Sequence, residues 1–155
     1  MTRWEKFEYL RDKGWTYNPE TGKIFNSRGK VCNNLKTDGY VQCGFAIYKN
    51  GKIVKTYYLS GHHFAWYWAN GNVEIDTIDH INRNEADNRI CNLRNVTQQQ
   101  NTWNTKSKGY YYHKQSKKYM ARIALNNKQL YLGCYDTPEE ARQAYLNAKQ
   151  KYHVI

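Results

Sequence analysis

The order of polar and apolar residues between positions 75 and 101 limits this stretch to a short run of defined elements. Its opening residues predict a strand that ends at Asp79 and His80. A polar loop follows, and a second short strand is expected over residues 92–96. Thr97 then suits the N-cap of a helix, and Asn101 lies one turn inside that helix. The segment therefore predicts strand, loop, strand and helix in this order.

A strand end and a facing helical residue can bring two oxygen ligands to one cation. Asp79 offers a carboxylate and Asn101 an amide oxygen, and such ligands suit Mg²⁺ or Mn²⁺. His80 adjoins the expected metal. Imidazole groups ordinarily titrate at about pH 6.5, so a histidine here is suited to taking a proton from water. Each residue type is commonplace alone, and the prediction depends on the spacing of the whole group.

Caps and a tight-turn dipeptide divide the first 70 residues into short elements. Thr2 and Glu5 have the spacing of a capping box, and Asn50-Gly51 suits a type I′ turn between two strands. The elements expected here are a helix at 3–13, strands at 40–48 and 53–59, and a helix at 62–69 that stops before Gly71.

The last third of the chain has the pattern of a separate small domain. Three short strands are expected at residues 110–112, 119–125 and 128–135. Thr137, Pro138 and Glu140 have the order of N-cap, first helical residue and N3, and alanine and tyrosine recur beyond them at helical spacing. The prediction is an α+β chain with domains at residues 1–104 and 108–155, the second a three-stranded antiparallel sheet packed on one C-terminal helix.

The charge of the chain is strongly positive and unevenly distributed. The 155 residues carry 24 Lys and Arg against 13 Asp and Glu, and residues 102–155 hold 10 of the basic but only 3 of the acidic ones. Eight of the 15 tyrosines also lie there. Cations interleaved with rings favour a nucleic-acid partner, although a basic soluble surface over a Tyr-rich core is the plain alternative. An anionic membrane surface fits less well, because no helix pairs a basic face with a broad apolar one.

Other classes of protein are disfavoured by the same sequence. No stretch approaches 18 apolar residues, and the first residues lack the apolar region of a signal peptide, so a membrane or secreted protein is not expected. The cysteines are widely spaced without a CxxC pair, which favours plain thiols in a reducing cytosol over a zinc site or disulfides. These residues are Cys32, Cys43, Cys91 and Cys134.

Residues 62–104 resemble the HNH homing-endonuclease family, in particular its phage-type branch with a ββα-metal active site. The resemblance includes the helix-like run from His62 to Trp66 and five groups of polar residues in a familiar order. These groups are Asp79-His80 with Asn82, Asp87-Asn88, Asn92 with Leu93 and Arg94, Val96-Thr97, and Asn101. The chain departs from the family pattern at Asn101, which stands where histidine gives the name its last letter. An asparagine here also occurs in the family and favours Mg²⁺ over softer metals such as Zn²⁺.

The resemblance implies a role for each matched position. His80 would be the general base that deprotonates the attacking water, and Asp79 with Asn101 would hold one Mg²⁺ or Mn²⁺ per active site against the scissile phosphate. Asn92 would orient the ring of His80. The implied products are a 5′-phosphate and a 3′-hydroxyl. For the other polar residues the sequence leaves alternatives. Asp87 and Asn88 are expected to shape the loop and not to touch substrate, and Arg83, Arg89 and Arg94 to contact phosphate or solvent. His62 is expected either to pack within its helix face or to approach the site.

Residues 108–153 resemble the APETALA/ethylene-response-factor DNA-binding domain. The matched stretches are residues 108–110, 118–123 and 131–145, and the last covers strand, tight turn and capped helix. In that family the sheet enters the major groove and the helix packs behind it. The residues that would face double-stranded DNA are Tyr111, His113, Lys118, Arg122, Gln129 and Tyr131. The family often has Arg and Trp at such places, so the tyrosines and the glutamine leave base preference open while backbone binding is retained.

Together these features predict a metal-dependent DNA endonuclease with a nuclease domain and a DNA-holding domain. The alternative is a DNA-binding regulator whose HNH fold has lost catalysis, and the presence of all four matched site residues favours the enzyme. An RNA-binding module is a weaker third interpretation, because a clear stacking platform is absent. A monomer is favoured over a dimer because no heptad pattern occurs. The family points to a phage or mobile element acting in bacterial cytoplasm.

Overall fold

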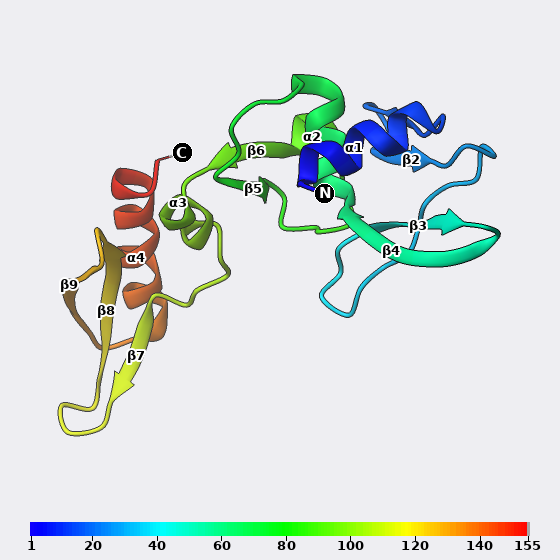
Figure 1. Cartoon of the computed structure of the whole chain (residues 1–155). Coiled ribbons are helices and arrows are strands. Elements are labelled where there is room, and N and C mark those ends of the chain that lie inside the picture. The colour runs from blue at the N-terminus through cyan, green and yellow to red at the C-terminus, as the bar shows by residue number, and fades with distance from the viewer. Residues whose placement is uncertain (155) are drawn as a thin grey trace. The chain divides into compact units, whose positions relative to one another are not determined.

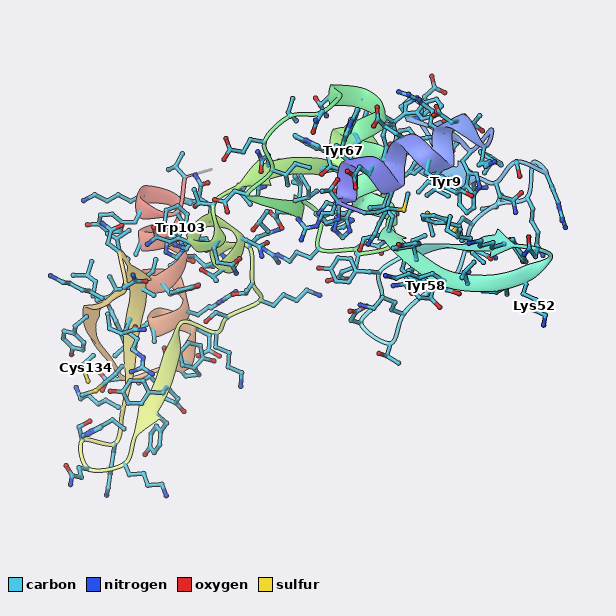
Figure 2. All side chains as sticks on the ribbon, in the orientation of Figure 1. Tyr9, Lys52, Tyr58, Tyr67, Trp103 and Cys134 are labelled. Atoms are coloured by element: carbon cyan, nitrogen blue, oxygen red, sulfur yellow. The ribbon has the colours of Figure 1, made fainter. Side chains whose placement is uncertain are left out.

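The computed structural model describes residues 1–154 as two compact units, residues 1–96 and 97–154 (Figure 1). The predicted α+β class is confirmed, since short antiparallel sheets alternate with helices throughout the chain. The units meet between Val96 and Thr97, whereas the sequence placed the domains at 1–104 and 108–155. The helix after Val96 belongs to the second unit, and its Trp103 (labelled in Figure 2) stacks on His153 of the same unit at 4.6 Å between ring centroids.

The first unit consists of two helices and three two-stranded antiparallel sheets. Its helices are α1 (Arg3–Asp12) and α2 (Gly61–Asn70), and a 3₁₀ turn, η1, covers Ile90–Asn92. The sheets pair β1 (Thr16–Asn18) with β2 (Lys23–Phe25), β3 (Gln42–Lys49) with β4 (Lys52–Ser60), and β5 (Thr77–His80) with β6 (Leu93–Val96).

Local signals account for the ends of these elements. Thr2 and Glu5 form the predicted capping box of α1, with the Thr2 hydroxyl accepting from the Glu5 amide at 3.2 Å. Asn50 and Gly51, with φ of 51° and 72°, make the turn between β3 and β4 as expected for type I′. The second predicted strand of the site segment begins one residue late, because Asn92 donates its amide to Arg89 and closes η1.

An aromatic core holds the first unit together. Phe7 of α1 contacts Phe64 of α2 at 5.2 Å between ring centroids, and both rings are almost completely buried. Around them lie Leu10, Tyr17, Ile24, Cys43, Leu59, Ala65, Tyr67, Ile78 and Leu93. Because this core includes Ile78 of β5 and Leu93 of β6, packing of α1 and α2 fixes the strands that carry the candidate site.

The second unit has the predicted sheet-on-helix arrangement. Helix α3 (Gln98–Trp103) opens it, and strands β7 (Tyr110–His113), β8 (Lys118–Leu125) and β9 (Lys128–Tyr135) form an antiparallel sheet in this order. Helix α4 (Pro138–Tyr152) begins at the Thr137–Glu140 capping box and buries Ala141, Tyr145 and Ala148. Ile123 of β8 packs in the same cluster, so one face of the sheet is covered by α4 and the other is left outward.

No helix among residues 1–154 is both long and apolar enough to cross a membrane.

Gly22 and Gly29 offer a matched test of how the β1–β2 turn packs. Both have a left-handed backbone, with φ of +70° and +71°, but a Cβ on Gly22 would lie 2.5 Å from the Arg89 amide nitrogen, whereas one on Gly29 would meet nothing within 4 Å. We expect Gly29→Ala to cost about 1 kcal/mol of unfolding free energy and Gly22→Ala about 3 kcal/mol, because only the second adds displacement of packed backbone. Urea denaturation of both variants measures the difference, and equal losses would contradict the packing.

Candidate active site

Asp79 and His80 lie side by side at the end of β5, where the sequence placed them. The antiparallel register puts Asp79 opposite Arg94 and His80 opposite Leu93 of β6. Both side chains are buried, with residue exposures of 6% and 4%. Burying a carboxylate and an imidazole is costly without polar partners, so the contacts of each decide what it can do.

The carboxylate of Asp79 is paired with Arg94 across the two strands. Arg94 Nε donates to Asp79 Oδ2 at 2.8 Å, and Nη2 lies 2.7 Å from the same oxygen. The sequence left Arg94 between phosphate contact and solvent, and the structure instead shows it balancing a buried negative charge. The register explains the pairing, because residues directly opposite on an antiparallel ladder are close neighbours.

His80 is held by the side chain of Asn88. Its Nε2 lies 3.1 Å from Asn88 Oδ1, and Asn88 is 2% exposed. From the sequence, Asn88 was expected to shape the loop through local bonds. The Asp-Asn pair in the sequence signalled a structured loop, but not that its asparagine returns to the histidine eight residues earlier.

Asn92 holds the loop that joins His80 to β6. Its Oδ1 accepts from the Asn82 amide at 2.9 Å, and its Nδ2 donates to the Asp87 carbonyl at 2.8 Å. These bonds link both ends of the loop to η1. Asn88 makes the side-chain bond to the His80 ring described above, and an effect of Asn92 on that ring would pass through the loop.

Asp87 and Arg89 close the same loop as an ion pair. Arg89 Nε donates to Asp87 Oδ1 at 2.8 Å, and Nη2 donates to Oδ2 at 2.6 Å. This guanidinium lowers the pKa of Asp87 to about 2, against a smaller opposing effect of burial. Asp87 is therefore charged at neutral pH, and both of its carboxylate oxygens are paired with Arg89. This pairing fits the loop-shaping role expected from the sequence.

Three aromatic rings meet beside the candidate base. The ring centroids of His62 and Tyr40 lie 5.5 Å and 5.7 Å from that of His80, and 5.2 Å from each other. His62 Nδ1 is buried without a hydrogen-bond partner. The structure thus brings His62 to the site, one of its two expected places, whereas no pattern in the sequence marked Tyr40 as a neighbour of His80.

The environment of His62 keeps its ring neutral. Burial lowers the pKa of His62 to about 3, with smaller contributions from His63, His80 and Arg3, against an opposing one from Asp38. Burial likewise lowers the pKa of His63 to about 4. A neutral His62 adds no positive charge beside His80.

Asn101, the second predicted metal ligand, lies on α3 in the second unit. The N-cap is as expected, because the Thr97 hydroxyl accepts from the Gln100 amide at 3.2 Å. Asp79 and Asn101 therefore belong to different units, and their joint ligation of a metal stays a prediction. Among residues 1–154, no group of three or more His, Cys, Asp or Glu side chains is arranged to hold a metal. An ion at Asp79 would rely on amide, water and phosphate oxygens, which Mg²⁺ accepts.

The six predicted DNA-facing residues lie on the three strands of the second unit. Tyr111 and His113 are on β7, Lys118 and Arg122 on β8, and Gln129 and Tyr131 on β9. Along β8 the buried Ala121 and Ile123 alternate with exposed Arg122 and Ala124, so Arg122 lies on the face turned away from α4.

The guanidinium of Arg122 is positioned by stacking on the ring of Tyr111, and not by an ion pair with a carboxylate. Its guanidinium carbon lies 4.9 Å from the centroid of Tyr111, and its register partner on β9 is Tyr131, which is 60% exposed. Lys118, by contrast, forms an exposed ion pair with Asp136 at 3.0 Å. A cation stacked on a ring keeps its donors directed outward, which suits contact with phosphate.

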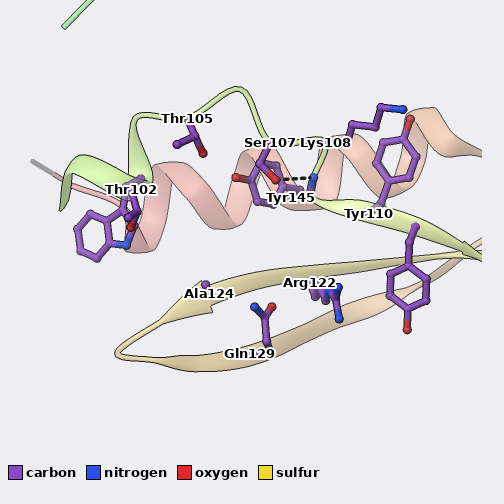
Figure 3. Close-up of a pocket in the computed structure, with 12 residues that line it drawn as sticks. Thr102, Thr105, Ser107, Lys108, Tyr110, Arg122, Ala124, Gln129 and Tyr145 are labelled. Atoms are coloured by element: carbon purple, nitrogen blue, oxygen red, sulfur yellow. Dashed lines mark hydrogen bonds between the residues drawn. The ribbon is translucent and has the colours of Figure 1, made fainter. Parts of the chain in front are cut away.

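A cavity of about 340 Å³ adjoins this face within the second unit. Arg122 and Gln129 line it from the β8–β9 hairpin (Figure 3). The opposite side is lined by Thr102, Trp103, Thr105, Ser107, Lys108 and Gly109. Tyr145 of α4 also borders it. The lining carries two cations, Arg122 and Lys108, and no carboxylate. The cavity therefore extends the positive character of the outer face.

Comparison with known proteins places a family signal on the same segment. Residues 61–102 match the family model described as HNH endonuclease. No curated protein matches the chain. Among solved structures, the chain is similar to one described as "DNA binding and cleavage by the HNH homing endonuclease I-HmuI", with 22% sequence identity and a TM-score of 0.48, over 92% of this chain and 84% of that one. The family match includes Asp79, His80, Asn88, Asn92 and Asn101.

The lowered pKa of His62 predicts acid sensitivity of the first unit. Below about pH 6.5 the unfolded chain binds a proton that the folded chain refuses, so the unfolding free energy should fall as pH drops from about 6.5 toward about 3. His62→Phe should lessen this slope and leave the part due to His63. Denaturant unfolding across this range measures it. His113→Gln, in the second unit, serves as the control, and an unchanged slope in His62→Phe would contradict the assignment.

Proposed function

We propose that this protein is a metal-dependent endonuclease of the HNH type that hydrolyses phosphodiester bonds in double-stranded DNA. The observation that carries the proposal is the Asp79-His80 pair, buried at one strand end and held by Arg94 and Asn88, inside the segment that matches the HNH endonuclease family. A buried imidazole at a strand end is suited to activating water near a metal-bound phosphate, and the carboxylate of the preceding residue is suited to holding the metal.

His80 is proposed as the general base. It takes a proton from a water molecule whose oxygen attacks phosphorus, and the bond from phosphorus to the 3′ oxygen breaks. The leaving 3′ oxygen takes a proton from a second water molecule, so the products carry a 5′-phosphate and a 3′-hydroxyl. The expected neutral state of His62 supports this role, because a second positive charge beside His80 would oppose its protonation.

Asp79 and Asn101 are proposed to hold one Mg²⁺ or Mn²⁺ ion. Their donor set of a carboxylate and an amide oxygen fits a hard divalent cation, and the present pairing with Arg94 shows that Asp79 accepts positive charge where it lies. When bound, the ion supplies Lewis acidity toward the phosphoryl and leaving oxygens. Arg94 balances the carboxylate in the protein without the ion.

The second unit is proposed to hold the DNA through its outer face. Arg122, stacked on Tyr111, provides a phosphate contact, and the exposed Tyr131 provides a ring next to it. The net positive charge of residues 102–155 supports binding that weakens steeply with salt. Base preference is not part of the proposal, since phosphate contacts position a protein without specifying sequence.

His80→Ala and Asp79→Ala test the catalytic assignment. Incubated with supercoiled plasmid and phage DNA in Mg²⁺, the protein should cut, and EDTA should stop it. Loss of a general base costs at least about a hundredfold in rate, so His80→Ala should show no cleavage at equal time while DNA affinity in a gel-shift assay is unchanged. A monomer with one site should give open-circle product first.

Matched controls are available within the same region. Asp76→Ala removes an exposed carboxylate three residues before Asp79, and His63→Ala removes an imidazole next to His62. Both should cut as the parent protein does. Cleavage that survives His80→Ala would contradict the assigned base, whereas salt-sensitive binding without any cleavage by the parent protein on these DNAs would favour the catalytically inactive regulator.

Arg122→Gln tests the DNA-binding face. Removing one phosphate contact should weaken binding and reduce the slope of log affinity against log salt by about 0.9. Lys151→Gln, on α4, removes the same charge from the helix that covers the other face and should leave the slope unchanged. Equal slopes for both variants and the parent protein in fluorescence anisotropy titrations would contradict a role for this face.

A further inference from the structure

We propose that Asn88 is a positioning residue that fixes neutral His80 in the tautomer protonated at Nε2, so that Nδ1 is the nitrogen that takes the proton from water. This inference rests on the proposed function for the meaning of Nδ1. The state of the His80 ring can be tested separately, because the tautomer is a property of the protein before any DNA is bound.

The chemistry of the contact sets the direction of the hydrogen bond. A neutral imidazole carries a proton on one nitrogen and a lone pair on the other, and the bond made by one nitrogen decides the role of the second. An amide oxygen can only accept. Because Asn88 Oδ1 lies 3.1 Å from His80 Nε2 in a buried setting, the bond forms only when Nε2 carries the proton.

The opposite tautomer would place two lone pairs against each other. With the proton on Nδ1, the Nε2 lone pair would face the Asn88 oxygen, and two buried acceptors would be left without a shared donor. The burial of both residues keeps water from relieving this arrangement. Asn88 therefore favours one tautomer without touching substrate, which distinguishes it from a catalytic residue.

The Asn88 amide lies between His80 and the start of α2, with its oxygen toward the imidazole. Its nitrogen points toward the first residue of α2, where a Cβ on Gly61 would lie only 2.9 Å from Nδ2. Gly61 also bonds to the β3 side of the unit, its amide donating to the Val41 carbonyl at 2.8 Å. The amide nitrogen thus occupies space left by the glycine, and the oxygen is turned to the imidazole.

The backbone of Asn88 is fixed by the N-terminal part of the unit. Tyr17 of β1 donates its buried hydroxyl to the Asn88 carbonyl at 2.7 Å. Gly22, in the turn after β1, lies so close that a Cβ would come within 2.8 Å of the Asn88 carbonyl carbon. Tyr17 and Gly22 therefore fix the backbone of Asn88, and Asn88 in turn positions His80. This gives β1 and the turn after it a role in the site.

The ring of His80 reports the tautomer directly by nuclear magnetic resonance. In the metal-free full chain labelled with ¹⁵N, long-range proton–nitrogen correlations at a pH where the ring is neutral should show the pyrrole-type nitrogen at Nε2 and the pyridine-type nitrogen at Nδ1. The His80→Gln spectrum identifies the signals by their absence. A pyrrole-type signal at Nδ1 in the parent protein would overturn the proposal without any variant of Asn88.

Asn88→Leu and Asn88→Asp separate positioning from packing. Leucine keeps the branching at Cγ but removes the acceptor, so the ring should show mixed tautomers and the cleavage rate should fall about tenfold to hundredfold, as expected for loss of a supporting hydrogen bond to a functional histidine. Aspartate restores an acceptor and should restore both the Nε2–H signal and a larger part of the rate. DNA affinity should be unchanged in each.

A purely structural role for Asn88 predicts a different result. Both variants would then lower the unfolding free energy without altering the tautomer of the folded fraction, and that outcome would overturn the proposal. Tyr17→Phe gives a milder check, because it removes one hydroxyl that anchors Asn88 and leaves the ring in place. It should produce a smaller shift in the same direction as Asn88→Leu, and no shift would count against the anchor.

The two levels of the proposal fail in different ways. An Nε2–H signal in a protein that cuts no DNA would support the tautomer assignment and contradict the endonuclease function. Cleavage that requires His80, together with an Nδ1–H signal, would support the function and overturn the role of Asn88.

Discussion

Antiparallel pairing of β5 with β6 is the constraint on which the candidate site depends. The pairing buries Asp79 and His80 together and places Arg94 directly opposite the carboxylate. Two buried ionisable groups need partners, and both partners come from the chain that follows β5: Asn88 from the loop and Arg94 from β6. The geometry of the site is therefore a consequence of how this loop closes.

Much of the fold follows from local signals in the sequence. The caps at Thr2, Thr97 and Thr137 and the turn at Asn50-Gly51 all rest on interactions within four residues, which the sequence displays directly. The strand that ends at Asp79 and His80 was predictable for the same reason. The three-stranded sheet and its covering helix follow from alternation along β8 and from helical spacing along α4.

The partners of the site residues were less predictable, because they are set by tertiary packing. The site is completed by residues from three parts of the chain. Tyr40 comes from the loop before β3, Asn88 from the loop after β5, and Arg94 from β6. An Asn in a polar loop has many local bonds available to it, so its sequence neighbourhood does not reveal a return to His80. Arg94 became predictable only once the register of β5 against β6 was fixed, since a shift by one residue would turn it to the other face.

The asparagines divide the work of the polar segment between the loop and the histidine. Asn92 ties the loop to η1 through hydrogen bonds to two backbone groups, while the side-chain oxygen of Asn88 contacts the imidazole. Because Asn92 also bonds to the carbonyl of Asp87, the neighbour of Asn88, loosening one asparagine would displace the other. A chain with several asparagines here can thus fix the loop and orient the histidine through separate side chains.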